Sequence, residues 1–162
     1  MQKQKLIFDI DTFSRLSFSN EATGKLLSCR QKSSASTEAG GLLLGRYLLS
    51  SPCIIVDDIT MPCSIDKRSR YSFFRSLAHN IMAARTWRKS NKTCSTLGTW
   101  HTHAEPTPNP SGKDFQDWIN ILRKGRYQSD YLFFLILGTQ AARVWQGFRS
   151  GNFVELSRRL HA

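Results

Sequence analysis

The stretch from Thr99 to Asp114 constrains the fold more than any other part of this chain. The preceding residues Ser95–Trp100 are partly β-branched and predict a short strand that runs directly into His101 and His103. Side chains two residues apart on a strand point to the same face, so the two imidazoles are expected to project together. Two imidazoles held side by side form half of a tetrahedral metal site.

A proline-rich segment follows the two histidines. Pro106, Pro108 and Pro110 exclude both helix and regular strand pairing, so a stiff loop is predicted there. Ser111 and Asp114 then occupy the N-cap and N3 positions of a predicted helix. Apolar residues continue that helix at the spacing of one face: Phe115, Trp118, Ile119 and Leu122. The loop therefore returns a carboxylate toward the histidines, and three such ligands with an open fourth position are typical of catalytic zinc.

Each part of this pattern also has a purely structural interpretation. A His-x-His on a strand is commonly a pair of surface or hydrogen-bonded histidines. A Ser-x-x-Asp at a helix start is commonly no more than a cap. The metal interpretation is favoured because both patterns occur in one short segment, joined by a loop that prolines make stiff.

The same residues resemble the JAMM signature of the JAB/MPN metalloproteases. In that signature, His-Ser/Thr-His is followed by seven residues, a serine, two residues and an aspartate, as in His101-Thr102-His103, Ser111 and Asp114. The family also places a glutamate upstream at the start of a strand, and the segment Glu38-Ala39-Gly40-Gly41-Leu42-Leu43-Leu44-Gly45 is similar to it. The resemblance covers roughly residues 20 to 140.

The alternation of predicted helices and strands, supported by the resemblance, predicts the fold class. We expect one α/β domain over residues 1–162, MPN/JAB-like, with a mixed central sheet flanked by helices. The resemblance further implies a zinc hydrolase that cuts isopeptide or peptide bonds at the C-terminal tail of ubiquitin-like proteins.

The resemblance also distributes the roles within the site. Zinc would be bound by His101, His103 and Asp114, and would lower the pKa of a bound water. Glu38 is then the expected general base, although it is otherwise an ordinary exposed loop carboxylate. Ser111 has two compatible roles, as the helix cap and as a donor to the oxyanion of the tetrahedral intermediate.

Glu105 is the competitor of Glu38 for the role of base. It lies in the proline loop, where the family varies, and is interpreted as a rim residue that contacts substrate. Trp100, beside the first histidine, is expected to face the core on the opposite side of the strand.

The local sequence His-Thr-His-Ala-Glu-Pro is similar to that of small bacterial members of the family. These include deconjugating peptidases encoded beside antiphage nucleotidyltransferases and ubiquitin-transfer-like enzymes. The expected function is therefore a zinc-dependent isopeptidase that releases a protein conjugated by ubiquitin-like machinery, in bacterial antiphage defence. The alternatives are processing of a sulfur-carrier protein, a non-catalytic MPN scaffold, or a basic module that binds nucleic acid.

The formal net charge of +11 favours acidic partners. Basic residues gather in four segments, 67–70, 85–92, 123–126 and 158–159. Few aromatic residues suited to base stacking lie among them, so an acidic protein surface is preferred over nucleic acid as the partner.

The cysteines and the apolar runs bear on the compartment. The four cysteines are widely spread and form no Cys-x-x-Cys pair, so free thiols are predicted. The longest apolar run, residues 131–137, is far shorter than a membrane span, and the amino terminus has too few apolar residues for a signal peptide. No membrane association and a cytoplasmic location are expected.

The remaining periodicity predicts the other elements of the fold. Strands are expected at residues 5–10, 42–49, 53–61, 131–138, 142–148 and 153–156, and helices at 19–30 and 71–88. Loops are expected at 31–37 and 62–70. Gly40 and Gly41 are expected to let substrate backbone approach closely, and His79 is predicted to be a surface histidine.

Overall fold

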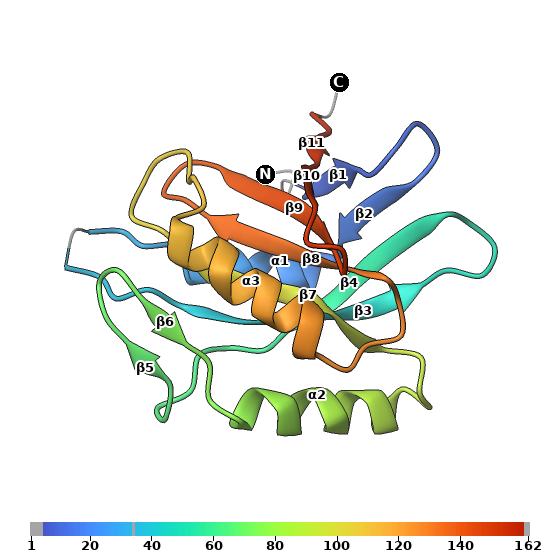
Figure 1. Cartoon of the computed structure of the whole chain (residues 1–162), viewed down its shortest axis with the longest axis horizontal. Helices are drawn as coiled ribbons and strands as arrows, with labels where there is room; N and C mark the ends of the chain where they lie inside the picture. Colours follow the sequence, from blue (N-terminus) through green and yellow to red (C-terminus); the bar gives the residue numbers. More distant parts are fainter. Residues whose placement is uncertain (1–4, 34, 161–162) are drawn as a thin grey trace.

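The computed structural model describes residues 5–33 and 35–160, and its main element is a mixed sheet of nine strands (Figure 1). The ends of the predicted domain, residues 1–4 and 161–162, and position 34 of the predicted loop lie outside the described residues. The order of strands across the sheet is β10-β9-β8-β7-β3-β4-β2-β1-β11.

The sheet strands are β1 (Ile7–Asp9), β2 (Arg15–Phe18), β3 (Gly40–Tyr47), β4 (Cys53–Ile59), β7 (Ser95–Thr102), β8 (Tyr131–Leu137), β9 (Ala142–Phe148), β10 (Phe153–Glu155) and β11 (Ser157–Arg158). A separate hairpin pairs β5 (Lys67–Arg68) with β6 (Phe73–Phe74). The helices are α1 (Asn20–Ser28), α2 (Ala78–Lys89) and α3 (Gly112–Lys124). Two strand pairs, β2 with β4 and β7 with β8, are parallel, and the other pairs are antiparallel.

The helices cover both faces of the sheet, α1 on one face and α2 and α3 on the other (Figure 1). Alternating side chains of β8 fill the two cores. Phe133 packs into the core that includes Leu26 of α1, whereas Phe134 packs into the core that includes Trp118 of α3. On the α2 side, Leu42 of β3 packs with Ala83. The predicted α/β class, with a mixed sheet flanked by helices, is confirmed.

The predicted helix over residues 71–88 is wrong at its beginning. Helix α2 begins only at Ala78, and the preceding residues form β6 and a turn. The hairpin is tied to the start of β3, because the Glu38 N–H donates to the Ser69 carbonyl at 2.8 Å. Arg68 Nε also donates to the Glu38 carbonyl at 2.7 Å. These contacts with distant residues outweigh the local helical spacing of Phe74.

The prediction that His79 lies on the surface is also wrong. Its side chain is fully buried, and Nε2 lies 2.9 Å from an oxygen of Asp66, whose side chain is equally buried. Its other nitrogen, Nδ1, lies 2.6 Å from Oγ1 of Thr60. Because Thr60 Oγ1 accepts from the Leu42 N–H, its own proton is free to bond to the ring. His79 therefore joins α2 to the sheet and to the loop before β5.

The glycines at the start of β3 serve the packing of the protein itself. A Cβ on Gly40 would lie 2.5 Å from a ring carbon of Phe73 and 2.8 Å from the Trp100 carbonyl oxygen. A Cβ on Gly41 would collide with the Thr60 carbonyl. The predicted approach of substrate backbone is thus replaced by the approach of β6 and β7.

The predicted free thiols are found in the part of the chain that the structure describes. Cys29, Cys53, Cys63 and Cys94 are free. No described helix has the length and apolar character needed to cross a membrane.

Candidate metal centre

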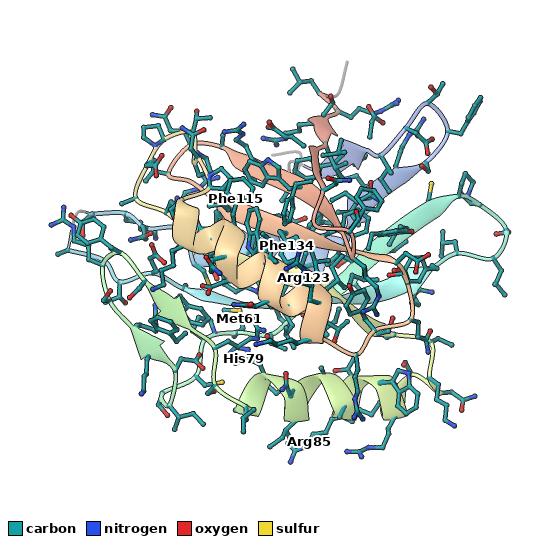
Figure 2. The ribbon with its side chains drawn as sticks, viewed as in Figure 1. Met61, His79, Arg85, Phe115, Arg123 and Phe134 are labelled. Atoms are coloured by element: carbon teal, nitrogen blue, oxygen red, sulfur yellow. The ribbon has the colours of Figure 1, made fainter. Side chains whose placement is uncertain are left out.

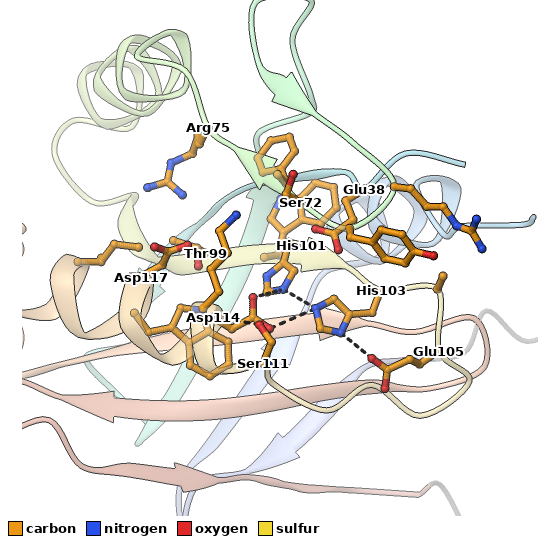
Figure 3. Close-up of a pocket in the computed structure, with 18 residues that line it drawn as sticks. Glu38, Ser72, Arg75, Thr99, His101, His103, Glu105, Ser111, Asp114 and Asp117 are labelled. Carbon is orange, nitrogen blue, oxygen red and sulfur yellow. Dashed lines mark hydrogen bonds and ion pairs between the residues drawn. The ribbon is translucent and has the colours of Figure 1, made fainter. Parts of the chain in front are cut away.

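The two histidines stand where β7 leaves the sheet (Figure 3). His101 pairs with Gly40 of β3, and His103 follows directly after the strand. The chain stays anchored beyond β7, because the His103 N–H donates to the Leu137 carbonyl at 3.0 Å. The two rings lie on the same side, with centroids 4.9 Å apart, as the two-residue spacing predicts.

Asp114 reaches the histidines from the first turn of α3. Ser111 is the N-cap, and its Oγ accepts from the Asp114 N–H at 3.1 Å. In return, Oδ2 of Asp114 accepts from the Ser111 N–H at 2.7 Å, which completes a capping box. The cap therefore fixes the orientation of the same carboxylate that faces the two imidazoles.

The three side chains fit a zinc ion by distance and by donor chemistry. Nε2 of His101 lies 3.1 Å from Nε2 of His103. The Asp114 carboxylate lies 3.2 Å from each of these nitrogens, through a different oxygen. Ligand atoms around a tetrahedral zinc, with bonds of about 2.0–2.1 Å, are separated by about 3.3 Å. Two ring nitrogens and a carboxylate that converge at this spacing are a suitable set of ligands for zinc.

The carboxylate of Asp114 is held in its ionised form. Burial acts to raise its pKa, but hydrogen bonds from His101 and His103 outweigh burial and hold the pKa well below its usual range. The pKa of His103 is raised: burial lowers it, and the Asp114 carboxylate together with the charges of Glu38 and Glu105 more than compensates.

Glu38 lies two residues before Gly40, which pairs with His101 in the antiparallel ladder between β3 and β7, and it lines the same pocket as His103. Its side chain is only 7% exposed, so it is not the exposed loop carboxylate of the alternative interpretation. Burial is the main reason why its pKa rises to about 7, with further effects from His103, which lowers it, and Asp114, which raises it. A carboxyl group with this pKa exchanges protons readily near neutral pH.

Glu105 contacts the metal centre from outside. Its Oε1 lies 3.2 Å from Nδ1 of His103, the ring nitrogen that faces away from His101. Its Oε2 accepts from the Asn109 N–H at 3.3 Å, so the proline loop holds the carboxylate in place. The side chain is 49% exposed and lines the pocket, as a rim residue does, but it also orients a candidate ligand.

These side chains line a pocket of about 480 Å³ between the β5–β6 hairpin and α3 (Figure 3). Tyr71 and Phe73 of the hairpin segment form one wall, and Ser111 and Trp118 form part of the other. The Lys113 ammonium lies 4.0 Å from the centre of the Phe74 ring, which joins α3 to the hairpin across the pocket.

All five residues predicted for the site, Glu38, His101, His103, Ser111 and Asp114, line this one pocket. Sequence reasoning missed three supporting contacts: Glu105 with His103, Arg68 with the Glu38 carbonyl, and the Thr102 hydroxyl that accepts from the Ala39 N–H at 2.9 Å. For Glu105 a local signal existed, because it follows His103 by only two residues. The position of Arg68 has no such signal.

A second group of potential ligands, Cys63, Asp66 and His79, lies within bonding distance of one ion. Both nitrogens of His79 already have partners, in Asp66 and Thr60. The Asp66 oxygens also accept from the backbone N–H groups of Cys63 and Ser76. No lone pair of His79 is left for a metal, so this group is a structural network.

Comparison with known proteins gives one family. A family described as prokaryotic homologs of the JAB domain matches residues 22–150. Among solved structures, the protein DSY2949 from Desulfitobacterium hafniense has a TM-score of 0.62 at 20% identity, and the match covers 88% of this chain and 90% of that protein. This likeness shows the fold.

Curated relatives share more of the sequence. A protein of Pseudomonas aeruginosa named CD-NTase/cGAS isopeptidase is 41% identical over 97 residues, which are 59% of this chain and 60% of the relative. A protein of Escherichia coli with the same name is 28% identical over 156 residues, which are 96% of this chain and 95% of the relative.

Proposed function

The chain belongs to the family of prokaryotic homologs of the JAB domain, and from this membership we propose that it is a zinc-dependent isopeptidase. The observation that carries the proposal is the convergence of His101, His103 and Asp114 at mutual distances of 3.1–3.2 Å beside a buried glutamate. The relatives named CD-NTase/cGAS isopeptidase support the same class of reaction.

His101, His103 and Asp114 would hold the zinc. When bound, zinc supplies a Lewis acid and lowers the pKa of a coordinated water. The protein supplies the geometry: β7 fixes His101, the capping box fixes Asp114, and Glu105 fixes the ring of His103.

Glu38 is the general base and then the general acid. Its carboxylate lines the metal pocket, where it takes a proton from the attacking water and donates that proton to the leaving amine. Ser111 stabilises the oxyanion, since its Oγ accepts the helix N–H while its own proton stays free to donate.

The proposed substrate is a protein joined to another protein through its C-terminal carboxyl group. The names of the relatives suggest that a CD-NTase is one partner of this conjugate, and the proposed setting is bacterial antiphage defence. The scissile bond of this substrate would bind in the pocket of about 480 Å³ that the candidate metal ligands line.

Cleavage of defined conjugates tests this function. Wild-type protein loaded with zinc should release the amine-bearing protein from a CD-NTase conjugate. Gel electrophoresis and mass spectrometry of the intact products measure this release. Glu38→Gln should keep its zinc but lose roughly 10²–10⁴-fold in rate, because it lacks the base. A Glu38→Gln variant as active as the wild type, with equal zinc content, would overturn the assignment. Absence of any cleavage by the zinc-loaded wild type would overturn the isopeptidase itself.

A further inference from the structure

A groove continues from the metal pocket between α2 and α3. The next cavity, of about 520 Å³, shares Arg75, Thr99 and Ile121 with the metal pocket. A third cavity, of about 240 Å³, shares Thr96, Arg126 and Tyr127 with the second. The three cavities therefore lie next to one another over the face of the sheet.

The floor and walls of this groove suit an extended peptide. Leu42 of β3 and Leu132 of β8 contribute apolar surface to the floor, and Ile121 of α3 and Trp87 of α2 contribute apolar surface to the walls. An extended chain rises about 3.3 Å per residue, so several residues fit along the row of cavities.

The charges of the groove have one sign beyond the metal pocket. Arg75, Lys124 and Arg126 line the two outer cavities, and no carboxylate lines either of them. The ion pairs of the described residues use other cations: Arg15, Lys25, Arg46, Arg143 and Arg159. Three cations without a carboxylate partner thus face the same groove.

Arg75 lies where the groove meets the metal pocket. Figure 3 shows Arg75 and Asp117 at the end of the pocket opposite Glu105. Burial lowers the pKa of Arg75, while the more distant charges of Asp66 and Asp117 only partly offset this effect. A half-buried guanidinium without a direct ion pair is stabilised when a ligand brings a carboxylate to it.

From these cavities and these charges we propose that the groove between α2 and α3 binds an extended acidic segment of the protein substrate, adjoining the scissile bond. Arg75, Lys124 and Arg126 form ion pairs with the carboxylates of this segment. The side chains that lie between those carboxylates pack on the apolar floor. This specificity rests on the proposed isopeptidase function, but its test does not depend on cleavage.

Binding of labelled peptides to the Glu38→Gln protein tests the groove. A ten-residue peptide with alternating glutamates should bind about tenfold more tightly than the same peptide with glutamines, as measured by fluorescence anisotropy. Raising the salt concentration should remove much of this difference, because the contacts are ionic. Equal affinity for the two peptides at low salt would overturn the proposal.

Charge reversals on the same background locate the binding. Lys124→Glu and Arg126→Glu should each lower the affinity for the acidic peptide about tenfold. Both positions are exposed, so neither change should alter the fold. The matched control is Arg85→Glu, because Figure 2 shows Arg85 on the side of α2 that faces away from the sheet. It makes the same change in net charge and should alter affinity less than twofold. An equal loss of affinity in the control would mean that only the overall charge of +11 determines binding, and would overturn the proposed groove site.

Two further outcomes separate the alternatives. In the first, a single-stranded oligonucleotide displaces the labelled peptide at a lower concentration than unlabelled glutamate peptide does, and this displacement is lost in the Lys124 and Arg126 variants. That result would show that the groove binds nucleic acid rather than an acidic protein segment. Groove-dependent peptide binding by a protein that cleaves no conjugate would instead overturn the isopeptidase and leave the groove in place.

Discussion

The carboxylate of Glu105 and Nδ1 of His103 are 3.2 Å apart, on the side of the imidazole opposite to the metal ligands. An N–H at Nδ1 that donates to this carboxylate leaves Nε2 unprotonated, with its lone pair directed at the site. Nε2 is the nitrogen that lies 3.1 Å from His101. Glu105 is therefore placed to favour the tautomer of His103 that would bind a metal through Nε2, and we propose this positioning role for it.

Glu105→Ala should lower zinc affinity by about 10–100-fold, because His103 loses the partner that orients its ring. Competition with a chromophoric chelator measures this constant without any assay of activity. Glu105→Gln keeps an acceptor for the Nδ1 proton and should recover part of the loss. Unchanged affinity in Glu105→Ala would return Glu105 to the role of a simple rim residue.

Zinc content should depend on the three predicted ligands alone. The wild type should carry about one zinc per chain, and His101→Ala, His103→Ala and Asp114→Asn should each lose it, because each removes or weakens a ligand. Asp114→Asn keeps an oxygen for the Ser111 N–H, so the helix cap survives. Elemental analysis gives the ratio, and Cys63→Ser is the control that should retain the metal. Full zinc in all three variants would exclude this site.

The raised pKa of Glu38 predicts a dependence of stability on pH in the zinc-free protein. The folded state holds the Glu38 proton up to about pH 7, whereas the unfolded chain releases it near its ordinary value. Between these values the folded state binds more protons, so the free energy of unfolding should fall as pH rises from about 5 to about 7. Above this window, Glu38→Gln should be more stable than the wild type by about 1–3 kcal/mol in urea titrations. Parallel stability curves for the two proteins would show that Glu38 has no raised pKa.

Ser111 caps α3, and substitutions can separate this role from its proposed role at the oxyanion. Ser111→Gly removes the hydroxyl at a small cost in capping, so turnover should fall about 10²–10³-fold while the melting temperature changes little. Ser111→Thr retains the hydroxyl and should keep most of the turnover. Equal turnover in the glycine variant and the wild type would leave Ser111 as a cap only.

His79→Ala should destabilise the fold by about 2–5 kcal/mol, because it leaves the buried Asp66 carboxylate without its imidazole partner. Chemical unfolding measures the change. Cys63→Ser, on the same loop as Asp66, should cost less than about 1 kcal/mol. A neutral His79→Ala would contradict the structural role of this network.

The segment that contains the candidate ligands could be predicted because its determinants are local. Prolines exclude regular structure between Pro106 and Pro110, and the capping box joins residues only three positions apart, Ser111 and Asp114. The shared face of His101 and His103 follows from the geometry of a strand. The family resemblance drawn from these residues is confirmed by the match over residues 22–150.

Other predictions were wrong where residues distant in the sequence determine the local conformation or burial. The apolar spacing of Tyr71–Leu77 fits a helix, but Ser69 and Arg68 bond to Glu38 and hold this segment as a hairpin. His79 has polar neighbours in the sequence, yet Asp66 and Thr60 give it two buried partners. The periodicity of a sequence segment does not indicate which residues of other helices, strands or loops will form hydrogen bonds with it.

The sequence by itself determined the strand that carries the two histidines, the capping of α3 and the identity of the three candidate ligands, because each depends on short-range patterns in one segment of the chain. Only the tertiary structure decided that Glu38 is buried in the same pocket as His103 and that the Glu105 carboxylate lies beside that histidine. It also decided that Arg75, Lys124 and Arg126 line one groove. These relationships depend on desolvation and on contacts across the β3–β7 ladder and between α2 and α3, which exist only when the packed chain brings distant side chains together.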